Sequence, residues 1–488
     1  MKEESWTKVM EEISDIHVVE AVRLRRKHRR PLWMGLIAVA VVAAVVVGNL
    51  FWKEEKPVMP TAQAVSLAVY PETAVCPYLL GSGPENGERM KPWLNDRDAR
   101  ATCSKQYQGA LDGFLATTIP QLLAGHEGQN RMYSPLSLYM SLAMLAEITD
   151  GESREQVLGL LGAPDLETLR LQAQAVWKAN YVNDGASTRI LATSLWLSED
   201  VDFVQKTMDR LAETYHTSSY QVEMGTQGTN QALREWIIEQ TGGLLQEQAQ
   251  GLEFHVDTVL ALASTVHYRA KWQSAFAPER TQGMLFYGFK RAVNYKFIKQ
   301  RSVLQYYQGE NFSAVFLPME GGGGMWLMLP EEGGLPEELL NSGEVVRFLL
   351  NQEIWENSTY PMVDLIIPKM NITSDLDLRQ ELQALGVTDV FDAQVSDFTP
   401  MTEQKNGICI GEVSYAIQVV VDEEGSSAAD YTVMGMEGTH ATQPEETIEF
   451  DVRRPFLYAI TGEDGLPLFI GTYYEPDVMS QLSASKSR

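Results

Sequence analysis

The feature that most constrains the fold is a segment near the C-terminal end, residues 416–455. It opens as a strand, because apolar side chains alternate along residues 417–421. A charged stop with a glycine follows at residues 422–425, and residues 426–429 then carry only small side chains. Regular structure is expected to resume at Phe450. A run of small residues directly after a strand either forms a surface loop or enters the sheet as an additional strand, and this segment alone leaves both interpretations open.

Three stretches of the chain resemble the serpins, the fold family of serine protease inhibitors. One is similar to that family's hinge, and it comprises Glu423, Glu424, Gly425, Ser426, Ser427, Ala428 and Ala429. Residues 450–476 resemble its C-terminal signature, and residues 130–137 resemble its pattern of Asn, three residues and Ser-Pro-Leu-Ser. The resemblance covers about residues 107–476. It implies an α+β serpin fold, with a large central mixed sheet, smaller sheets, surrounding helices and an exposed reactive-centre loop.

An apolar run at residues 32–52 precedes this region. Its length of about 21 residues, at about 1.5 Å each, matches the hydrocarbon core of a bilayer. The basic cluster at residues 23–30 predicts a cytoplasmic N-terminus, with Trp33 and Trp52 at the two interfaces. A cleaved signal peptide is the alternative, since residues 62–64 (Ala-Gln-Ala) have the form of a cleavage site, but they lie well past the apolar run. We therefore expect a single-pass anchor in the cell membrane, with the C-terminal domain extracellular.

The expected organisation follows from these segments. Although 488 residues would suggest two or three domains, the resemblance implies one large domain. The parts are a cytoplasmic tail (1–30), a transmembrane signal anchor (31–52), a linker and N-terminal extension (53–103), the serpin domain (104–477) and a disordered C-terminal tail (478–488). Within the extension, residues 62–101 are expected to be largely irregular, because glycines and prolines interrupt them.

Periodicity predicts the main elements of the domain. Helices are expected over residues 104–123, 138–148, 204–215, 230–240 and 378–385, and strands over 189–197, 259–272, 313–318, 325–330 and 363–370. Ser134 or Ser137 is expected to cap the second helix, with Pro135 in its first turn. Gly321–Gly324 suit a hairpin turn, since no Lys-Ser/Thr of a phosphate-binding loop follows them. Residues 147–153 depart from the family pattern, and a changed helix contact is expected there.

Composition and motifs bound the function. The net charge of −26 disfavours nucleic acid and heparin-like polyanions as partners. The cysteines, Cys76, Cys103 and Cys409, match no zinc spacing and are too few for a disulfide scaffold, and whether Cys76 and Cys103 pair stays open. Neither Gly-x-Ser-x-Gly nor His-Glu-x-x-His occurs, and no cofactor or metal site is predicted. Nothing in the sequence supports an enzyme.

The resemblance implies a monomeric suicide inhibitor of serine or cysteine proteases, whose cleaved loop inserts into the main sheet. Counted from Gly425 as in the family, the scissile bond is Thr439–His440, within a window of residues 434–442. No Lys or Arg occurs between Gly425 and Val452, which disfavours trypsin-like targets. Elastase-, subtilisin- or chymotrypsin-like proteases fit better.

Some residues depart from what inhibition would need. The resemblance places Trp272 in the region where the family's sheet opens, and it places Ser134, Ser137, Ser264 and Tyr415 beneath that sheet; the last two replace an Asn and a His. Asp430 would face inward with Ser426 on insertion, and an unpaired buried carboxylate costs several kcal/mol. A non-inhibitory binding or sensing ectodomain, cleaved as a plain substrate, is therefore the alternative function.

Overall fold

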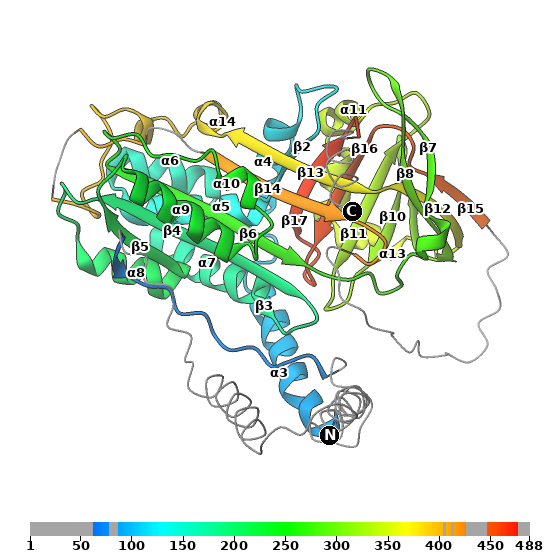
Figure 1. Ribbon diagram of the computed structural model, residues 1–488, viewed down its shortest axis with the longest axis horizontal. Helices are drawn as coiled ribbons and strands as arrows, with labels where there is room; N and C mark the ends of the chain where they lie inside the picture. The colour runs from blue at the N-terminus through cyan, green and yellow to red at the C-terminus, as the bar shows by residue number, and fades with distance from the viewer. Residues whose placement is uncertain (1–61, 78–85, 404–406, 411–413, 426–446, 477–488) are drawn as a thin grey trace, which may run out of the picture.

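The computed structural model describes residues 62–77, 86–403, 407–410, 414–425 and 447–476. Helices gather on one side of the molecule and two smaller sheets on the other, with a long sheet running between them (Figure 1). The helices are α3 (Asn86–Ser104), α4 (Asp112–Leu123), α5 (Pro135–Ile148), α6 (Gly151–Leu161), α7 (Leu166–Asn180), α8 (Gln205–Tyr215), α9 (Gln227–Gln240), α10 (Gln246–Ala249), α11 (Pro336–Ser342), α12 (Glu344–Leu350), α13 (Gln352–Glu356) and α14 (Arg379–Ala384). Two short 3-10 turns are η2 (Pro278–Arg280) and η3 (Asp389–Phe391).

The long sheet is built around β4 (Thr188–Ser198), whose residues are almost all buried because both of its faces are covered. It pairs in parallel with β5 (Thr217–Val222) and antiparallel with β6 (Leu260–Arg269). Short β3 (Val182–Asn183) pairs with its beginning, and β1 (Gln63–Ser66) adds an edge strand to β5. We call these five strands the first half of the main sheet.

A separate antiparallel pair lies beside β6. It consists of β13 (Met370–Asp377) and β14 (Ser414–Val421), which are in register over their whole length. We call this pair the second half of the main sheet. Figure 1 shows β6 and β14 side by side, with both arrows pointing the same way.

The two smaller sheets complete the fold. A six-stranded sheet runs in the order β2 (Arg131–Tyr133), β17 (Pro467–Tyr473), β16 (Phe456–Thr461), β11 (Gly324–Pro330), β10 (Phe312–Pro318) and β9 (Gln305–Gln308). A four-stranded sheet runs in the order β15 (Thr447–Asp451), β12 (Met362–Pro368), β8 (Ala292–Val303) and β7 (Gln282–Tyr287).

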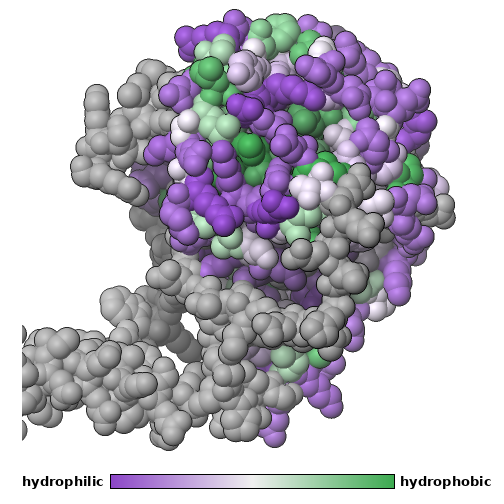
Figure 2. All heavy atoms as spheres, turned by 90° about the vertical axis from the view of Figure 1, so that its right-hand side faces the viewer, coloured by the Kyte–Doolittle hydropathy of each residue, from purple (hydrophilic) through white to green (hydrophobic). Residues whose placement is uncertain are grey.

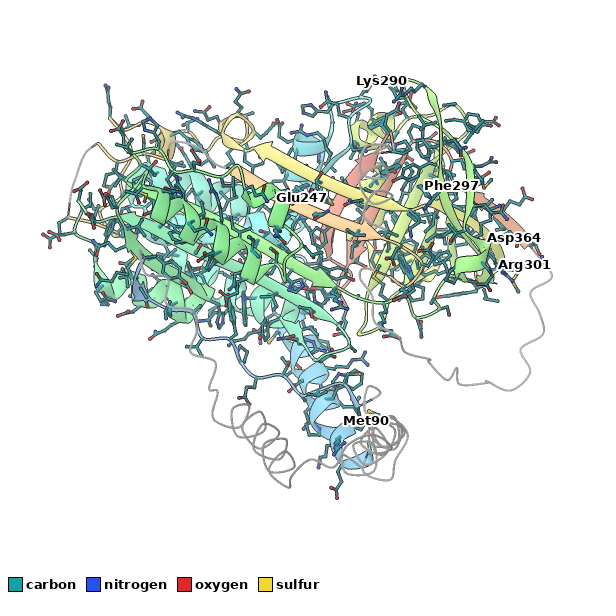
Figure 3. All side chains as sticks on the ribbon, in the orientation of Figure 1. Met90, Glu247, Lys290, Phe297, Arg301 and Asp364 are labelled. Carbon is teal, nitrogen blue, oxygen red and sulfur yellow. The ribbon has the colours of Figure 1, made fainter. Side chains whose placement is uncertain are left out.

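The outward face of the four-stranded sheet is largely hydrophilic, with scattered apolar side chains (Figure 2). Arg301 on β8 and Asp364 on β12 are cross-strand neighbours on it, with Nε and Oδ1 3.6 Å apart. They are labelled in Figure 3, together with Phe297, which is fully buried beneath the sheet. The alternation of buried and exposed residues along β8 therefore separates a core face from a solvent face.

Two buried clusters form the core. The larger one surrounds α5, nearly every residue of which is buried, and joins the helices to the six-stranded sheet. The smaller one packs α9 and α10 on the other face of β4, β5 and β6, with Trp196 and Trp236 at its centre. The main sheet is thus covered on both faces, so a strand that entered it would be buried.

Most sequence-predicted elements of the domain are confirmed, with shifts of a few residues at their ends. They include α5, α8, α9, β4, β6, α14 and the β10–β11 hairpin. Ser134 caps α5, accepting a hydrogen bond from Ser137 N at 3.3 Å. The strand predicted over residues 363–370 is two strands, β12 and β13, with the break at Lys369.

Two expectations near the N-terminus are wrong. Residues 62–101 are not largely irregular where they are described, because they contain β1 and most of the 19-residue helix α3. Buried contacts of Trp93 and Arg100 hold α3 in place despite Pro92 in its interior. The helix predicted from residue 104 begins at Asp112, after turns that include Gly109 at a φ of +77°.

The described ranges contain no helix that is both long and apolar enough to cross a bilayer. The cytoplasmic tail, the anchor at residues 31–52 and the C-terminal tail lie outside those ranges.

Candidate functional site

The candidate site is the boundary between β6 and β14. Each strand pairs on its far side only, β6 with β4 and β14 with β13, and no ladder joins the two strands in the described ranges. Their C-terminal ends lie at the same pole, since Trp272 N, after β6, donates to Glu424 O, after β14, at 3.1 Å. We call this end the hinge pole. A third strand that entered between two neighbouring strands running in the same direction would be antiparallel to both, and the two strands would have to move apart to admit it.

A cavity of about 520 Å³ follows the free edge of β6. The outer layer over it comes from α9 and α10, and the cavity reaches the segment that leads to β14. Its lining includes Leu233, Ile237, Leu245, residues 257–265, Gly407 and Cys409. The walls are mainly apolar, so a strand of small side chains that entered here would gain backbone hydrogen bonds and apolar burial.

A tight turn follows β14. The carboxylate of Asp422 accepts hydrogen bonds from Glu424 N at 2.9 Å and from Gly425 N at 3.2 Å, and Asp422 N donates to Gly425 O at 3.1 Å. The turn reverses the chain, so that Gly425 forms an antiparallel bridge with Lys271. Gly425, the last described residue of this segment, therefore runs antiparallel to the end of β6.

Glycine is required at position 425. Its φ is +129°, which side-chain-bearing residues rarely adopt. A Cβ placed there would lie 2.6 Å from the Cα atom of Lys271 and 2.8 Å from Trp272 N. The close approach of the two backbones and the turn thus depend on the same missing side chain.

Trp272 fastens the turn to the end of β6. It is 3% exposed, and its indole Nε1 donates to Asp422 O at 2.9 Å. Phe276 N donates to Glu423 O at 2.8 Å. The rings of Trp272 and Phe276 meet edge to face, with centroids 5.9 Å apart. Trp272, which the resemblance placed where the family's sheet opens, lies at the hinge pole beside the turn after β14.

Glu423 anchors the turn to the neighbouring sheet. Its carboxylate lies 2.6 Å from Lys369 Nζ, directly after β12, and accepts from Thr281 Oγ1 at 2.7 Å. Burial alone would raise the pKa of Glu423, but the hydrogen bonds from Lys369 and Thr281 outweigh it, so that the pKa is lower than that of an ordinary glutamate.

Two of the predicted serines meet beneath the sheet. Ser137 Oγ on α5 and Ser264 Oγ on β6 lie 2.7 Å apart, which links the buried helix to the free edge strand. Ser134 lies at the cap of the same helix. Tyr415 belongs to β14, where its backbone is in register with Leu376. The structure thus brings Ser137 and Ser264 together, across the sheet opening from the strand that carries Tyr415.

Some predicted site residues cannot be located. Ser426 to Ala429 and the Thr439–His440 bond lie outside the described residues. Conversely, sequence reasoning gave no role at the hinge to Asp422, Thr281 or Lys369. An Asp three residues before a Gly signals a turn of this kind, and could have identified Asp422. The contacts of Thr281 and Lys369 depend on tertiary packing and have no local signal.

These features define a class of protein: a mixed α+β fold whose main sheet has an unpaired boundary, with a glycine hinge at one end of it. A family model described as Serpin (serine protease inhibitor) matches residues 110–476. The chain belongs to the serpin family, whose members are generally protease inhibitors, although some serpins are not inhibitory.

Individual relatives are distant. The chain is 26% identical over 424 residues to "Putative serpin-Z12" of Oryza sativa subsp. japonica, covering 81% of this chain and 96% of that protein. It is 24% identical over 384 residues to "Plasminogen activator inhibitor 1" of Bos taurus, covering 74% of this chain and 91% of that protein. Among solved structures, the thermophilic serpin Tengpin in its native state has a TM-score of 0.66 at 22% identity and covers 75% of this chain and 93% of its own. Thyroxine-binding globulin in complex with thyroxine has a TM-score of 0.66 at 17% identity, covering 75% and 99%, and both structural likenesses concern the fold.

Proposed function

We propose that this chain is a suicide inhibitor of serine proteases, and that its mechanism is insertion of the cleaved loop between β6 and β14. The target's nucleophile attacks the carbonyl carbon of Thr439, an ester forms, and the amine of His440 leaves as a new N-terminus. The freed segment after Gly425 then enters the sheet and carries the bound protease with it. Loop insertion of this kind is a recognised form of strand addition.

The observation that carries the proposal is the geometry of Gly425. Its bridge to Lys271 is antiparallel, and it lies where the first residue of a strand between β6 and β14 would lie. The next four residues, Ser-Ser-Ala-Ala, have small side chains that need little space once β6 and β14 separate. Each added backbone hydrogen bond stabilises the product by about 1 kcal/mol net, and apolar burial adds to this.

The target class follows from the absence of Lys and Arg between Gly425 and Val452. A trypsin-like protease needs a basic residue in its acidic specificity pocket. Elastase-, subtilisin- and chymotrypsin-like proteases accept small or apolar residues such as Thr439, Met434 or Met436. We infer that the physiological targets belong to these classes and that the inhibitor acts as a monomer.

We also propose that residues 31–52 anchor the chain in the cell membrane with the domain outside. The position of Gln63, near the start of the described chain, supports an orientation in which the hinge pole points away from the membrane. Gln63 pairs with Gln221, at the end of the main sheet where β6 begins, whereas Gly425 bridges Lys271 beyond the other end of β6. Ten residues of strand separate these ends by about 33 Å. A tether before Gln63 would therefore hold the molecule by the pole opposite its hinge, which leaves the hinge pole accessible to soluble proteases.

The test uses the soluble part of the chain after the anchor, mixed with an elastase or a subtilisin. The proposal predicts an SDS-resistant band of summed mass and loss of protease activity. The Ser426→Arg variant should become a plain substrate, because the arginine would have to be buried on insertion. Clean cleavage of the unaltered protein, with active protease left over, would instead support the non-inhibitory alternative.

A further inference from the structure

The segment before α4 forms a strap along the first half of the main sheet. We define the strap as residues 62–77 and 86–104, which include β1 and α3. It starts at the edge of β5, away from the hinge pole, and reaches the turn between β3 and β4, where Cys76 N donates to Asp184 O at 2.8 Å. Since Thr188 of β4 pairs with Arg269 of β6, this turn lies at the hinge pole.

Side chains fix the strap to this first half. Tyr70 stacks on Trp177 of α7, with ring centroids 5.8 Å apart. The indole Nε1 of Trp93, on α3, donates to the Asp184 carboxylate at 2.9 Å. Helix α3 projects from the body beside β3 (Figure 1), and Met90 lies toward its outer end (Figure 3). The strap should therefore move with β4 and β6.

The same helix also contacts a different sheet. Arg97 Nε lies 3.0 Å from Glu463 Oε1, and Arg100 Nε lies 3.4 Å from Glu463 Oε2. Glu463 occupies the turn between β16 and β17 of the six-stranded sheet. One carboxylate thus receives two guanidinium groups from one face of α3.

The second half of the main sheet is attached to that six-stranded sheet. Met132 N on β2 donates to Ser374 Oγ on β13 at 3.3 Å, and β2 pairs with β17. The end of β6 is also bonded to this sheet, because Gln273 N donates to Pro318 O at 2.9 Å and Glu320 N donates to Lys271 O at 2.8 Å.

Opening the boundary between β6 and β14 at the hinge pole would therefore strain these backbone contacts together with the contacts that join Asp184 to Glu463 through the strap. The strap is fixed to the first half of the main sheet by Trp93 and to the six-stranded sheet by its two arginines.

We infer that Glu463 is a positioning residue for sheet opening: through Arg97 and Arg100 it holds the two halves together at the hinge pole and sets the barrier to strand insertion. The inference rests on the proposed function for its biological meaning, because the strand that inserts there is the cleaved loop. Sheet opening itself can be measured without any protease.

The contact between Glu463 and the two arginines is partly shielded from solvent. The side chain of Arg100 is 9% exposed and that of Glu463 is 20% exposed, whereas that of Arg97 is 41% exposed. Charge-assisted contacts of this partly buried kind exceed ordinary surface ion pairs in strength. Neutralising Glu463 removes the charge that pairs with the guanidinium of the buried Arg100, so the Glu463→Gln variant should loosen the strap although its shape is kept.

The experiment measures the uptake of a synthetic peptide with the sequence of residues 426–439 into the intact protein, followed on native gels over time. The Glu463→Gln variant should take up the peptide about threefold to tenfold faster than the unaltered protein. The Arg100→Lys variant, which keeps the charge, should stay within about twofold of it. Asp150→Asn is the matched control, because it removes an ion pair of 2.8 Å with Arg154 at the start of α6, outside the strap and the cavity.

Equal uptake rates for Glu463→Gln and Asp150→Asn would overturn the inference. If Glu463→Gln does not fold, the exposed Arg97→Gln variant decides the question, with a rate increase of about twofold expected and no increase counting against the strap. A protein that takes up peptide at strap-dependent rates but forms no complex with any protease would refute the proposed function alone.

Discussion

The indole nitrogen of Trp272 and the carbonyl oxygen of Asp422 lie 2.9 Å apart, and this hydrogen bond fastens the end of β6 to the end of β14. The bond joins the two strands at the hinge pole. Further along the boundary the edge of β6 borders the cavity and, among the described residues, has no paired strand. The hinge end is thus held by a few replaceable contacts and not by a ladder of strand pairing.

The Trp272→Phe variant tests that bond. It retains a buried aromatic ring but leaves the Asp422 carbonyl without its indole donor, so the free energy of unfolding should fall by about 1–2 kcal/mol. Uptake of the residue 426–439 peptide should become faster at the same time. Chemical denaturation and native gels measure the two effects.

The matched control is Trp355→Phe, which removes a hydrogen bond of 2.7 Å from Trp355 Nε1 to Phe348 O. This bond joins α13 to α12 and does not involve the turn at residues 422–425. The control variant should lower stability by a similar amount and leave peptide uptake unchanged. Faster uptake in both variants would show that general destabilisation, and not the hinge contact, controls opening.

Glu423 should make stability depend on pH in the acidic range. Its pKa is lower in the folded protein than in the unfolded chain, although burial opposes this, because Lys369 and Thr281 donate to the carboxylate. The unfolded chain therefore binds the proton first as pH falls. The stabilisation is fully present above the ordinary glutamate pKa of about 4.3 and is lost as pH falls through the lower folded value.

Denaturation of the unaltered protein and of Glu423→Gln should be compared from pH 7 to pH 3. The difference in unfolding free energy should be about 1 kcal/mol at neutral pH and should shrink below about pH 4.3. A difference that stays constant over the whole range would mean that the Glu423 carboxylate does not contribute through its charge.

Much of this arrangement could be predicted from the sequence, because it depends on local signals. Alternation identified the strand now seen as β14, and the glycine at position 425 indicated the hinge. The cap of α5 followed from Ser134 and Pro135, whose preferences act within one helical turn.

Features that depend on distant segments escaped prediction. Helix α3 contains Pro92 and lacks a clear apolar stripe, and its stability comes from contacts of Trp93 and Arg100 with remote turns. The sequence showed that Glu147 departs from the family pattern, but it did not show which contacts this residue makes. That carboxylate is buried, with Arg170 at 2.7 Å and Arg210 at 3.0 Å, and it joins α5 to α7 and α8. No periodicity in one segment can indicate partners this far along the chain.

Replacing Gly425 should affect hinge and stability together. The Gly425→Ala variant would place a Cβ 2.6 Å from Lys271 Cα at a φ of +129°, so the turn must shift, at a cost of about 1–3 kcal/mol. Unfolding free energy and the fraction of protease trapped per cleavage should both fall. Gly159→Ala, within α6 with open space around its Cβ position, is the control and should leave both quantities unchanged or stability slightly higher. Normal trapping by Gly425→Ala would show that the hinge does not need this backbone conformation.

Cleavage near Thr439 should raise the melting temperature. Among the described residues the facing edges of β6 and β14 are unpaired, and a strand between them would pair with both while its small side chains enter the cavity. About five added hydrogen bonds at about 1 kcal/mol each, with apolar burial in addition, would shift the melting temperature upward by ten degrees or more on the order-of-magnitude scale for a domain of this size. Scanning calorimetry before and after limited proteolysis measures this shift, with mass spectrometry to locate the cut.

The nicked Ser426→Arg protein supplies the comparison, because an arginine at the start of the inserted strand blocks entry and should leave its melting temperature where it was. An unaltered protein that melts at the same temperature before and after the cut would show that no strand enters the boundary, and loop insertion would then have to be abandoned as the mechanism.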